Sequence, residues 1–226
     1  MLTSGSLHHA ILRHFVAHGY PPTHAALCTH FGVGADEMTS ALRGLMDDHG
    51  VVLHPHAPEV WIAHPFSAAP TIFCVRHGDR QWWGNCAWCA LGVGALVGGN
   101  DVSIDTVLGA DGAPATLHID DHQVREDLVV HFPIPMTRAW DNVVYTCSTM
   151  LAFASAADVD AWSRRHALPR GDVRPIQRVY EFARAWYGRH LDEDWRKWTT
   201  EEARELFGRF GFTGPIWELP PSGERF

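Results

Sequence analysis

The sequence predicts an α+β fold, in which a small helical unit precedes a mixed or antiparallel sheet with flanking helices. Apolar residues recur at helical spacing in the first 46 residues, which predicts helices there. Short apolar or alternating runs typical of strands follow between residues 71 and 132, and helical stripes return after residue 158. With 226 residues, 46% of them hydrophobic, the chain is long enough to bury a core in one or two domains.

Residues 1–64 have the pattern of a winged helix-turn-helix domain, with three helices followed by a strand hairpin. Leu7, Ile11 and Phe15 share one face of the first helix. The second helix ends at Gly32, and Asp36 begins the third. The expected elements lie at residues 7–18, 25–31, 36–46, 50–55 and 60–63.

The charge of this first domain argues against DNA binding. Residues 1–64 contain two arginines and five acidic residues, a net charge of −3, and the whole chain carries −8. A surface that contacts phosphates needs the opposite sign. We therefore expect no nucleic-acid partner, and a scaffold or lid role for this domain.

Residues 65–226 are expected to form the second domain, which carries the thiol site and ends in a helical tail. Residues 65–70 are expected to be a linker, and residues 88–97 a helix rich in small residues. Strand patterns occur at residues 71–76, 102–107, 116–119, 129–132 and 142–153. Helical patterns in the tail occur at residues 158–166, 176–187 and 199–210.

Two cysteines that lie 58 positions apart stand in distinctive surroundings. Cys89 is expected in the first turn of the helix at 88–97, with Asn85 as its N-cap, where backbone N–H groups favour a thiolate. Cys147 follows a run of apolar residues. Cys86 forms a C-x-x-C motif with Cys89, and thiols at that spacing can share one metal ion or form a disulfide.

Both surroundings resemble the active-site segments of the alkylmercury (organomercurial) lyases. The resemblance rests on Ala87-Trp-Cys-Ala-Leu91, and on Phe132-Pro-Ile-Pro135 leading into Tyr145-Thr-Cys-Ser148. It implies that two thiols hold mercury while the carbon–mercury bond is protonated. The family also uses an aspartate three residues after the first cysteine, where this chain has Gly92.

Three interpretations follow from the resemblance and the altered position 92. The favoured one is an organomercurial lyase in which Cys89 and Cys147 bind mercury and a cysteine, helped by Cys86, supplies the proton. The second is a protein on the same fold that binds mercury(II), copper(I) or zinc through Cys86, Cys89 and Cys147. The third is an enzyme of different chemistry with Cys89 as nucleophile. We expect no required cofactor, because the soft metal ion is the substrate or product. We also expect Gly92→Asp to raise the rate of carbon–mercury cleavage.

Several other polar residues are weaker candidates for the missing acid or for a metal site. The candidate acids are His77, Asp79, Asp101, Asp105 and Asp141. The histidine pairs His14/His18 and His54/His56 lack a third ligand at a familiar spacing. Cys28 and Cys74 are expected to be structural.

The expected location is the cytoplasm. Five cysteines are an odd number that does not indicate a disulfide scaffold, and the N-terminus lacks the pattern of a secretory signal. No apolar run approaches the roughly 20 residues that span a bilayer, so no membrane association is expected. The oligomeric state is left open.

Overall fold

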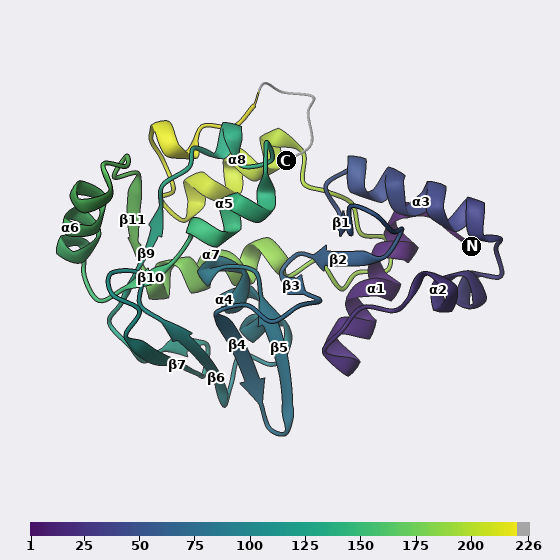
Figure 1. Cartoon of the computed structure of the whole chain (residues 1–226), viewed down its shortest axis with the longest axis horizontal. Coiled ribbons are helices and arrows are strands. Elements are labelled where there is room, and N and C mark those ends of the chain that lie inside the picture. Colours follow the sequence, from purple (N-terminus) through teal and green to yellow (C-terminus); the bar gives the residue numbers. More distant parts are fainter. Residues whose placement is uncertain (221–226) are drawn as a thin grey trace.

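The structure, a computed structural model, describes residues 1–220 and consists of helices packed around two antiparallel sheets (Figure 1). The helices are α1 (Ser4–His18), α2 (His24–Phe31), α3 (Ala35–Asp47), α4 (Ala87–Leu96), α5 (Val143–Thr149), α6 (Ala156–His166), α7 (Ile176–Tyr187) and α8 (Thr200–Arg209), with short 3-10 turns at Met136–Arg138 and Pro215–Trp217. The strands are β1 (Val52–Leu53), β2 (Val60–Ala63), β3 (Phe66–Ser67), β4 (Phe73–His77), β5 (Arg80–Gly84), β6 (Val102–Val107), β7 (Pro114–Asp120), β8 (Gln123–Val124), β9 (Val129–Phe132), β10 (Ala152–Phe153) and β11 (Asp172–Pro175). The predicted α+β class is confirmed.

The first three helices lie together at one end of the molecule (Figure 1). Helix α1 begins with a capping box in which Thr3 and Ser6 exchange hydrogen bonds, and it ends at Gly19, whose φ of 82° suits glycine. The indole N–H of Trp82 on β5 donates to the carbonyl of Phe15 on α1 (2.8 Å). Helix α1 is therefore attached directly to the larger sheet.

The larger sheet has the strand order β1-β2-β3-β5-β4-β6-β7-β8. The predicted hairpin is confirmed, because β1 and β2 pair antiparallel. The prediction of a linker at 65–70 is wrong: Phe66 and Ser67 form β3, which pairs with β2 on one side and β5 on the other. The cause is the fully buried Phe66 side chain, which makes this segment part of the core. The boundary between residues 64 and 65 stays a prediction, and β2 and β3 pair across it.

Strand β5 has no counterpart in the sequence prediction. It pairs with β4 through a tight turn at Gly78, which has a φ of 56°. The polar residues His77, Asp79 and Arg80 around this turn conceal the hairpin, because only one end of each strand is buried. That hairpin leads the chain directly into α4.

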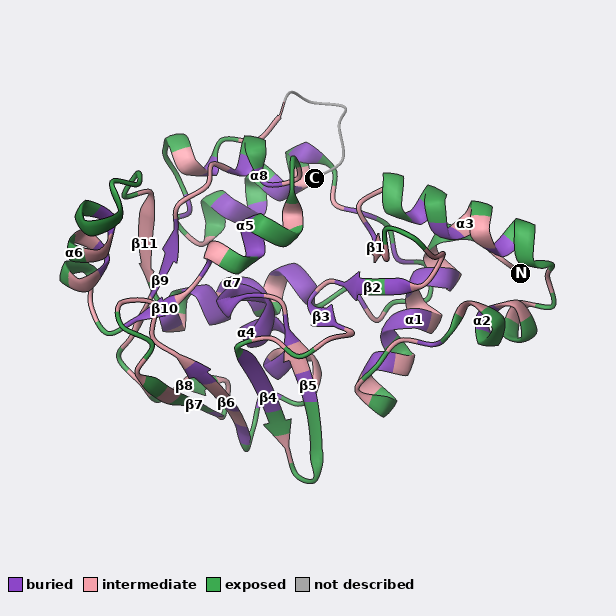
Figure 2. Cartoon of the chain, in the orientation of Figure 1, coloured by how far each residue is buried: buried purple, intermediate pink, exposed green. Residues whose placement is uncertain are grey.

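Helix α4 is the centre of the molecule and is buried along most of its length (Figure 2). It lies against the larger sheet on one side and α7 on the other. The prediction of a helix rich in small residues at 88–97 is confirmed. Glycines permit the close approach: a Cβ on Gly94 would lie 2.7 Å from Ile119 Cδ1 on β7.

The expected strand at 142–153 is wrong over most of its length, because residues 143–149 form α5. The side chain of Asn142 caps this helix by accepting a hydrogen bond from the N–H of Tyr145 (3.0 Å). The two residues of β10 are the part of the segment that is a strand, and they belong to the smaller sheet, β10-β9-β11. Cys147 is therefore presented from a helix rather than from the predicted strand, and its side chain is buried.

The helices of the tail are confirmed as α6, α7 and α8. The predicted capping box is present, since Thr199 accepts from the N–H of Glu202 (3.2 Å) while the Glu202 carboxylate accepts from the N–H of Thr199 (3.0 Å). Within residues 1–220, no helix combines the length and apolar character that crossing a bilayer requires.

Candidate thiol site

Cys89 lies in the first turn of α4, and Cys86 immediately precedes the helix. The Cys86 sulfur accepts a hydrogen bond from the N–H of Cys89 (3.3 Å), so Cys86 is the N-cap. The prediction of Asn85 as the N-cap is wrong, because Asn85 lies one residue before the capping position. Its backbone N–H donates to the carbonyl of Pro65 (3.4 Å). Both thiols are buried, and the positively polarised start of the helix favours a thiolate at Cys89.

Cys147 reaches the same place from α5. The N–H of Ala87 donates to the carbonyl of Met150 (3.0 Å), which joins the start of α4 to the end of α5. The hydroxyl of Thr146 donates to the carbonyl of Ala139 (2.9 Å) and fixes the buried side of α5. The Sγ atoms of Cys89 and Cys147 consequently lie within 4.8 Å of each other, although the two residues are 58 positions apart in the sequence.

A histidine that the sequence did not single out completes a group of three donor atoms. His64 Nε2 lies 3.7 Å from Cys147 Sγ, and these two atoms and Cys89 Sγ all lie within 4.8 Å of one another. His64 follows β2, and its Nδ1 is buried without a hydrogen-bond partner among the described residues. No spacing marked it among ten histidines in the first 64 residues.

The three thiols share hydrogen bonds that favour a single thiolate at Cys89. Burial acts to raise the pKa of Cys89, but hydrogen bonds from Cys147 and Cys86 outweigh it and hold that pKa well below the ordinary value. Burial raises the pKa of Cys86 well above its ordinary value. Hydrogen bonds to Cys86 and Cys89, together with burial, raise the pKa of Cys147 in the same way. Of the three thiols, Cys89 is thus the one that most readily loses its proton.

The thiols line a narrow cavity of about 60 Å³. Its wall is mostly aromatic and apolar, and includes Trp88, Trp140, Trp186, Trp195, Met136 and Met150. A cavity of ~150 Å³ in another protein is large enough for benzene. The space here is therefore suited to a metal atom with a short alkyl group.

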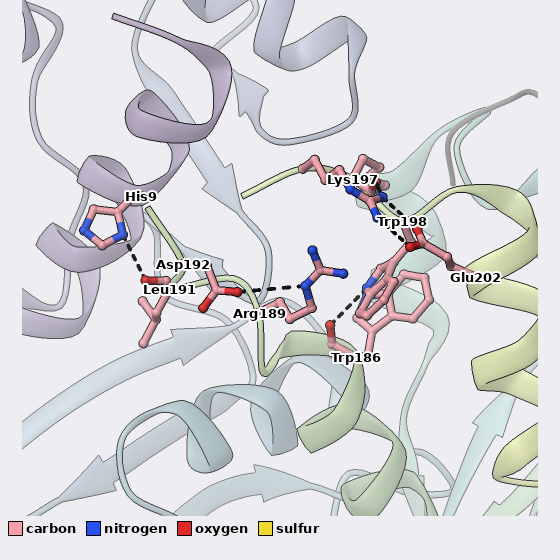
Figure 3. Close-up of polar contacts among 9 residues, drawn as sticks. His9, Trp186, Arg189, Leu191, Asp192, Lys197, Trp198 and Glu202 are labelled. Carbon is pink, nitrogen blue, oxygen red and sulfur yellow. Dashed lines mark hydrogen bonds and ion pairs between the residues drawn. The ribbon is translucent and has the colours of Figure 1, made fainter. Parts of the chain in front are cut away.

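The segment between α7 and α8 contributes His190, Trp195 and Lys197 to the cavity wall. Polar contacts attach this segment to its neighbours (Figure 3). The indole N–H of Trp198 donates to the carbonyl of Trp186 (3.1 Å). Nδ1 of His9 on α1 lies 2.9 Å from the carbonyl oxygen of Leu191. Contacts with α1 and α7 thus hold this part of the cavity wall in place.

Lys197, the single lysine of the chain, lines the cavity from this segment. Its Nζ lies 4.1 Å from the centroid of the Trp140 ring and donates to the carbonyl of His49 (3.4 Å). Burial lowers the pKa of Lys197 to about 7, and burial also lowers the pKa of His49 to about 4. At neutral pH, His49 is therefore uncharged, while Lys197 is near the midpoint of its titration and gains or loses its proton readily.

Gly92 lies three residues after Cys89, and the space that a side chain there would occupy is taken by a residue of another helix. A Cβ on Gly92 would lie 2.2 Å from Cδ2 of Tyr187, the last residue of α7. The hydroxyl of Tyr187 lies 3.5 Å from Cys89 Sγ. An aspartate at position 92 thus has no room beside this ring, which removes the basis for expecting Gly92→Asp to raise cleavage. In the sequence, Tyr187 is one member of an apolar helical stripe, which marks it as core.

The weaker candidates lie outside the cavity wall: His77, Asp79, Asp101, Asp105, Asp141, Cys28 and Cys74. Asp105 pairs with Arg76 on the sheet surface (2.9 Å). Asp141 pairs with Arg138 one turn before it. All five cysteines are free thiols. The sequence-predicted residues that meet at one site are Cys86, Cys89 and Cys147.

A family model described as alkylmercury lyase matches residues 66–188, a range that includes all three clustered cysteines. A solved structure described as the mercury-bound form of MerB2 has a similar fold, with a TM-score of 0.65 and 19% sequence identity. The similarity covers 82% of this chain and 91% of that one. None of the curated proteins matches the chain.

Proposed function

The chain belongs to the alkylmercury lyase family, and on that premise we propose that it cleaves the carbon–mercury bond of organomercurials by protonolysis. Cys89 and Cys147 are the thiols that hold the metal. The observation that carries this proposal is the approach of their sulfurs to within 4.8 Å at a buried cavity. Mercury is a soft metal and prefers thiolate ligands. The small cavity favours short-chain alkylmercury substrates such as methylmercury.

The proposed reaction needs one proton for each bond cleaved, and the thiol cluster holds it. The Cys89 thiolate bonds to mercury and displaces the external thiolate that accompanies the substrate. Cys147 gives up its proton as its sulfur bonds to the same mercury. The electron pair of the carbon–mercury bond stays on carbon, which takes up that proton and leaves as hydrocarbon. Mercury(II) remains between the two sulfurs until external thiols remove it, so the cycle needs no oxidant and no cofactor.

Release of hydrocarbon is the direct test of this proposal. Reduced protein is incubated without oxygen with methylmercury and excess free thiol, and methane is followed by gas chromatography. We expect the native chain to release methane, and Cys89→Ala and Cys147→Ala each to abolish both release and tight mercury binding. Cys28→Ala, which changes a thiol outside the cavity, is the matched control and should behave as the native chain. Stoichiometric mercury binding by the Cys89→Ala/Cys147→Ala double variant would show that the metal is held elsewhere.

Cys86 has two separable roles in this proposal, as a helix cap and as a third proton-bearing thiol. Serine is among the best N-cap residues, so Cys86→Ser retains the cap and removes the thiol. We expect Cys86→Ser to keep the native stability and to lower the rate of methane release about 10-fold or more, because a proton-bearing neighbour of both reacting sulfurs is weakened. Cys86→Ala should additionally lose about 1 kcal/mol of stability in urea unfolding, through loss of the cap. A native rate in Cys86→Ser would assign the residue to capping alone.

A second candidate function is stable binding of a soft metal ion without cleavage. His64 Nε2 favours it, because this atom adds a nitrogen donor beside the two sulfurs, and a set of two thiolates and one imidazole binds mercury(II), copper(I) or zinc. Retention of mercury through Cys89 and Cys147 with no release of methane would select this function.

A further inference from the structure

The space that a side chain at position 92 would occupy contains the ring of Tyr187. A Cβ on Gly92 would lie 2.2 Å from Cδ2 and 2.6 Å from Cε2 of that ring. Real Cβ atoms do not approach other atoms this closely, so the glycine and the tyrosine are a matched pair across the α4–α7 contact. The absence of a side chain on α4 thus allows α7 to place an aromatic residue in the thiol site.

The hydroxyl of Tyr187 is held beside the metal-binding sulfurs. It lies 3.5 Å from Cys89 Sγ, and the side chain is 3% exposed. The Tyr187 ring packs edge-on against His190, with ring centroids 4.9 Å apart, and lies tilted against Trp88, with centroids 6.0 Å apart. These contacts fix the direction of the hydroxyl before a substrate enters.

The position of this hydroxyl suits delivery of a proton to carbon. A sulfur that bonds to mercury loses its proton, and the alkyl group projects from the metal away from the sulfurs. The Tyr187 hydroxyl lies 3.5 Å from Cys89 Sγ, and so beside the position that a metal bonded to this sulfur would take. It also lies at the cavity wall, where the aromatic lining keeps water from competing as the proton source.

We propose that Tyr187 is a catalytic residue of the proposed lyase and relays the proton from the thiol cluster to the leaving carbon. The hydroxyl proton passes to carbon while the carbon–mercury bond breaks. At the same time the proton released by Cys147 passes to the hydroxyl oxygen, so that no phenolate accumulates and one proton is consumed for each hydrocarbon formed. This inference rests on the proposed lyase function.

The test compares two tyrosines of the same helix. Tyr187→Phe removes the hydroxyl and keeps the ring that fills position 92. Tyr180→Phe is the matched control, because Tyr180 is also on α7 and buried, but its hydroxyl bonds to His122 (3.0 Å), away from the cavity. Methane release in a single turnover and stoichiometric mercury retention are measured on the same preparation of each variant.

We expect Tyr187→Phe to slow methane release by about 100-fold or more while mercury retention is unchanged, since general acids contribute on that scale. Tyr180→Phe should match the native chain in both measurements. Retained mercury shows that the thiol pair is intact, which separates loss of the relay from loss of the fold. Native release by Tyr187→Phe would overturn the relay and leave the lyase proposal standing. No release by the native chain would overturn both.

Discussion

Gly92→Asp is expected to destabilise the protein by about 3 kcal/mol or more, because overpacking a core and burying a carboxylate both cost free energy. The new Cβ would lie 2.2 Å from the Tyr187 ring, and the carboxylate would be buried beside it. Helix α4 has little freedom to move, since the larger sheet and α7 pack on opposite sides of it. The free energy of unfolding in urea, measured for both chains, gives the size of the effect.

The cause of that loss is tested by removing the ring. Tyr187→Ala alone should destabilise by about 3–5 kcal/mol, the usual cost of deleting a buried aromatic ring. In Gly92→Asp/Tyr187→Ala, the aspartate fills part of the vacated space, so the double variant should be more stable than the sum of the two changes by about 1–3 kcal/mol. Gly92→Asp/Tyr187→Phe keeps the ring and should show no such relief. Additive costs in both double variants would mean that position 92 and Tyr187 do not compete for space.

Stability is expected to fall as the pH drops below 6.5, because several histidines are buried in the neutral form. Burial lowers the pKa of His8 and of His190 well below the ordinary value, and lowers that of His49 to about 4. Between pH 6.5 and the folded-state pKa values, the unfolded chain binds more protons than the folded chain, so acid favours unfolding. Each pKa unit of difference corresponds to about 1.4 kcal/mol.

His8→Phe is the variant that isolates this effect. The His8 ring stacks on Trp195 with centroids 3.6 Å apart, and neither ring nitrogen has a hydrogen-bond partner among the described residues. Phenylalanine keeps the stacking and cannot take up a proton. The stability gained by His8→Phe, measured by urea unfolding, should therefore be larger at pH 5 than at pH 8. An equal gain at both values would remove His8 from the acid response.

Lys197 makes the stability of the protein depend on pH above neutrality as well. Its pKa is about 7 in the folded chain, against an ordinary value of 10.5. Between these values the unfolded chain carries a proton that the folded chain lacks, so stability should rise with pH by up to about 5 kcal/mol. Lys197→Met should be more stable than the native chain at pH 7, and the difference should shrink towards pH 10.5. A difference that stays constant with pH would indicate that the amine is buried without a shift in its pKa.

The parts of this protein that the sequence could predict are those governed by local rules. The apolar stripe of α7 and the Thr199/Glu202 capping box depend on residues within a few turns of one another, and both are present. The meeting of Cys89 and Cys147 was expected from the family resemblance of their surroundings, and the structure brings them together.

The parts that the sequence could not predict depend on contacts between distant segments. His64 joins the thiols from 83 residues before Cys147, and no local pattern distinguishes it from its many neighbouring histidines. Tyr187 has a helical-stripe position that fits the core equally well, and only the packing of α4 against α7 shows that its ring fills position 92. The segment containing Cys147 is a helix rather than the predicted strand, because capping by Asn142 outweighs its β-branched residues.

The backbone hydrogen bond from Ala87 to Met150 has a consequence for ligand spacing. It joins the ends of the two helices that carry Cys89 and Cys147, and so the separation of the sulfurs is a property of this junction rather than of either helix. Metals of different radius need different separations of the same two ligands. The metal preference of the pair is therefore adjustable through residues at the junction, with every donor atom left in place.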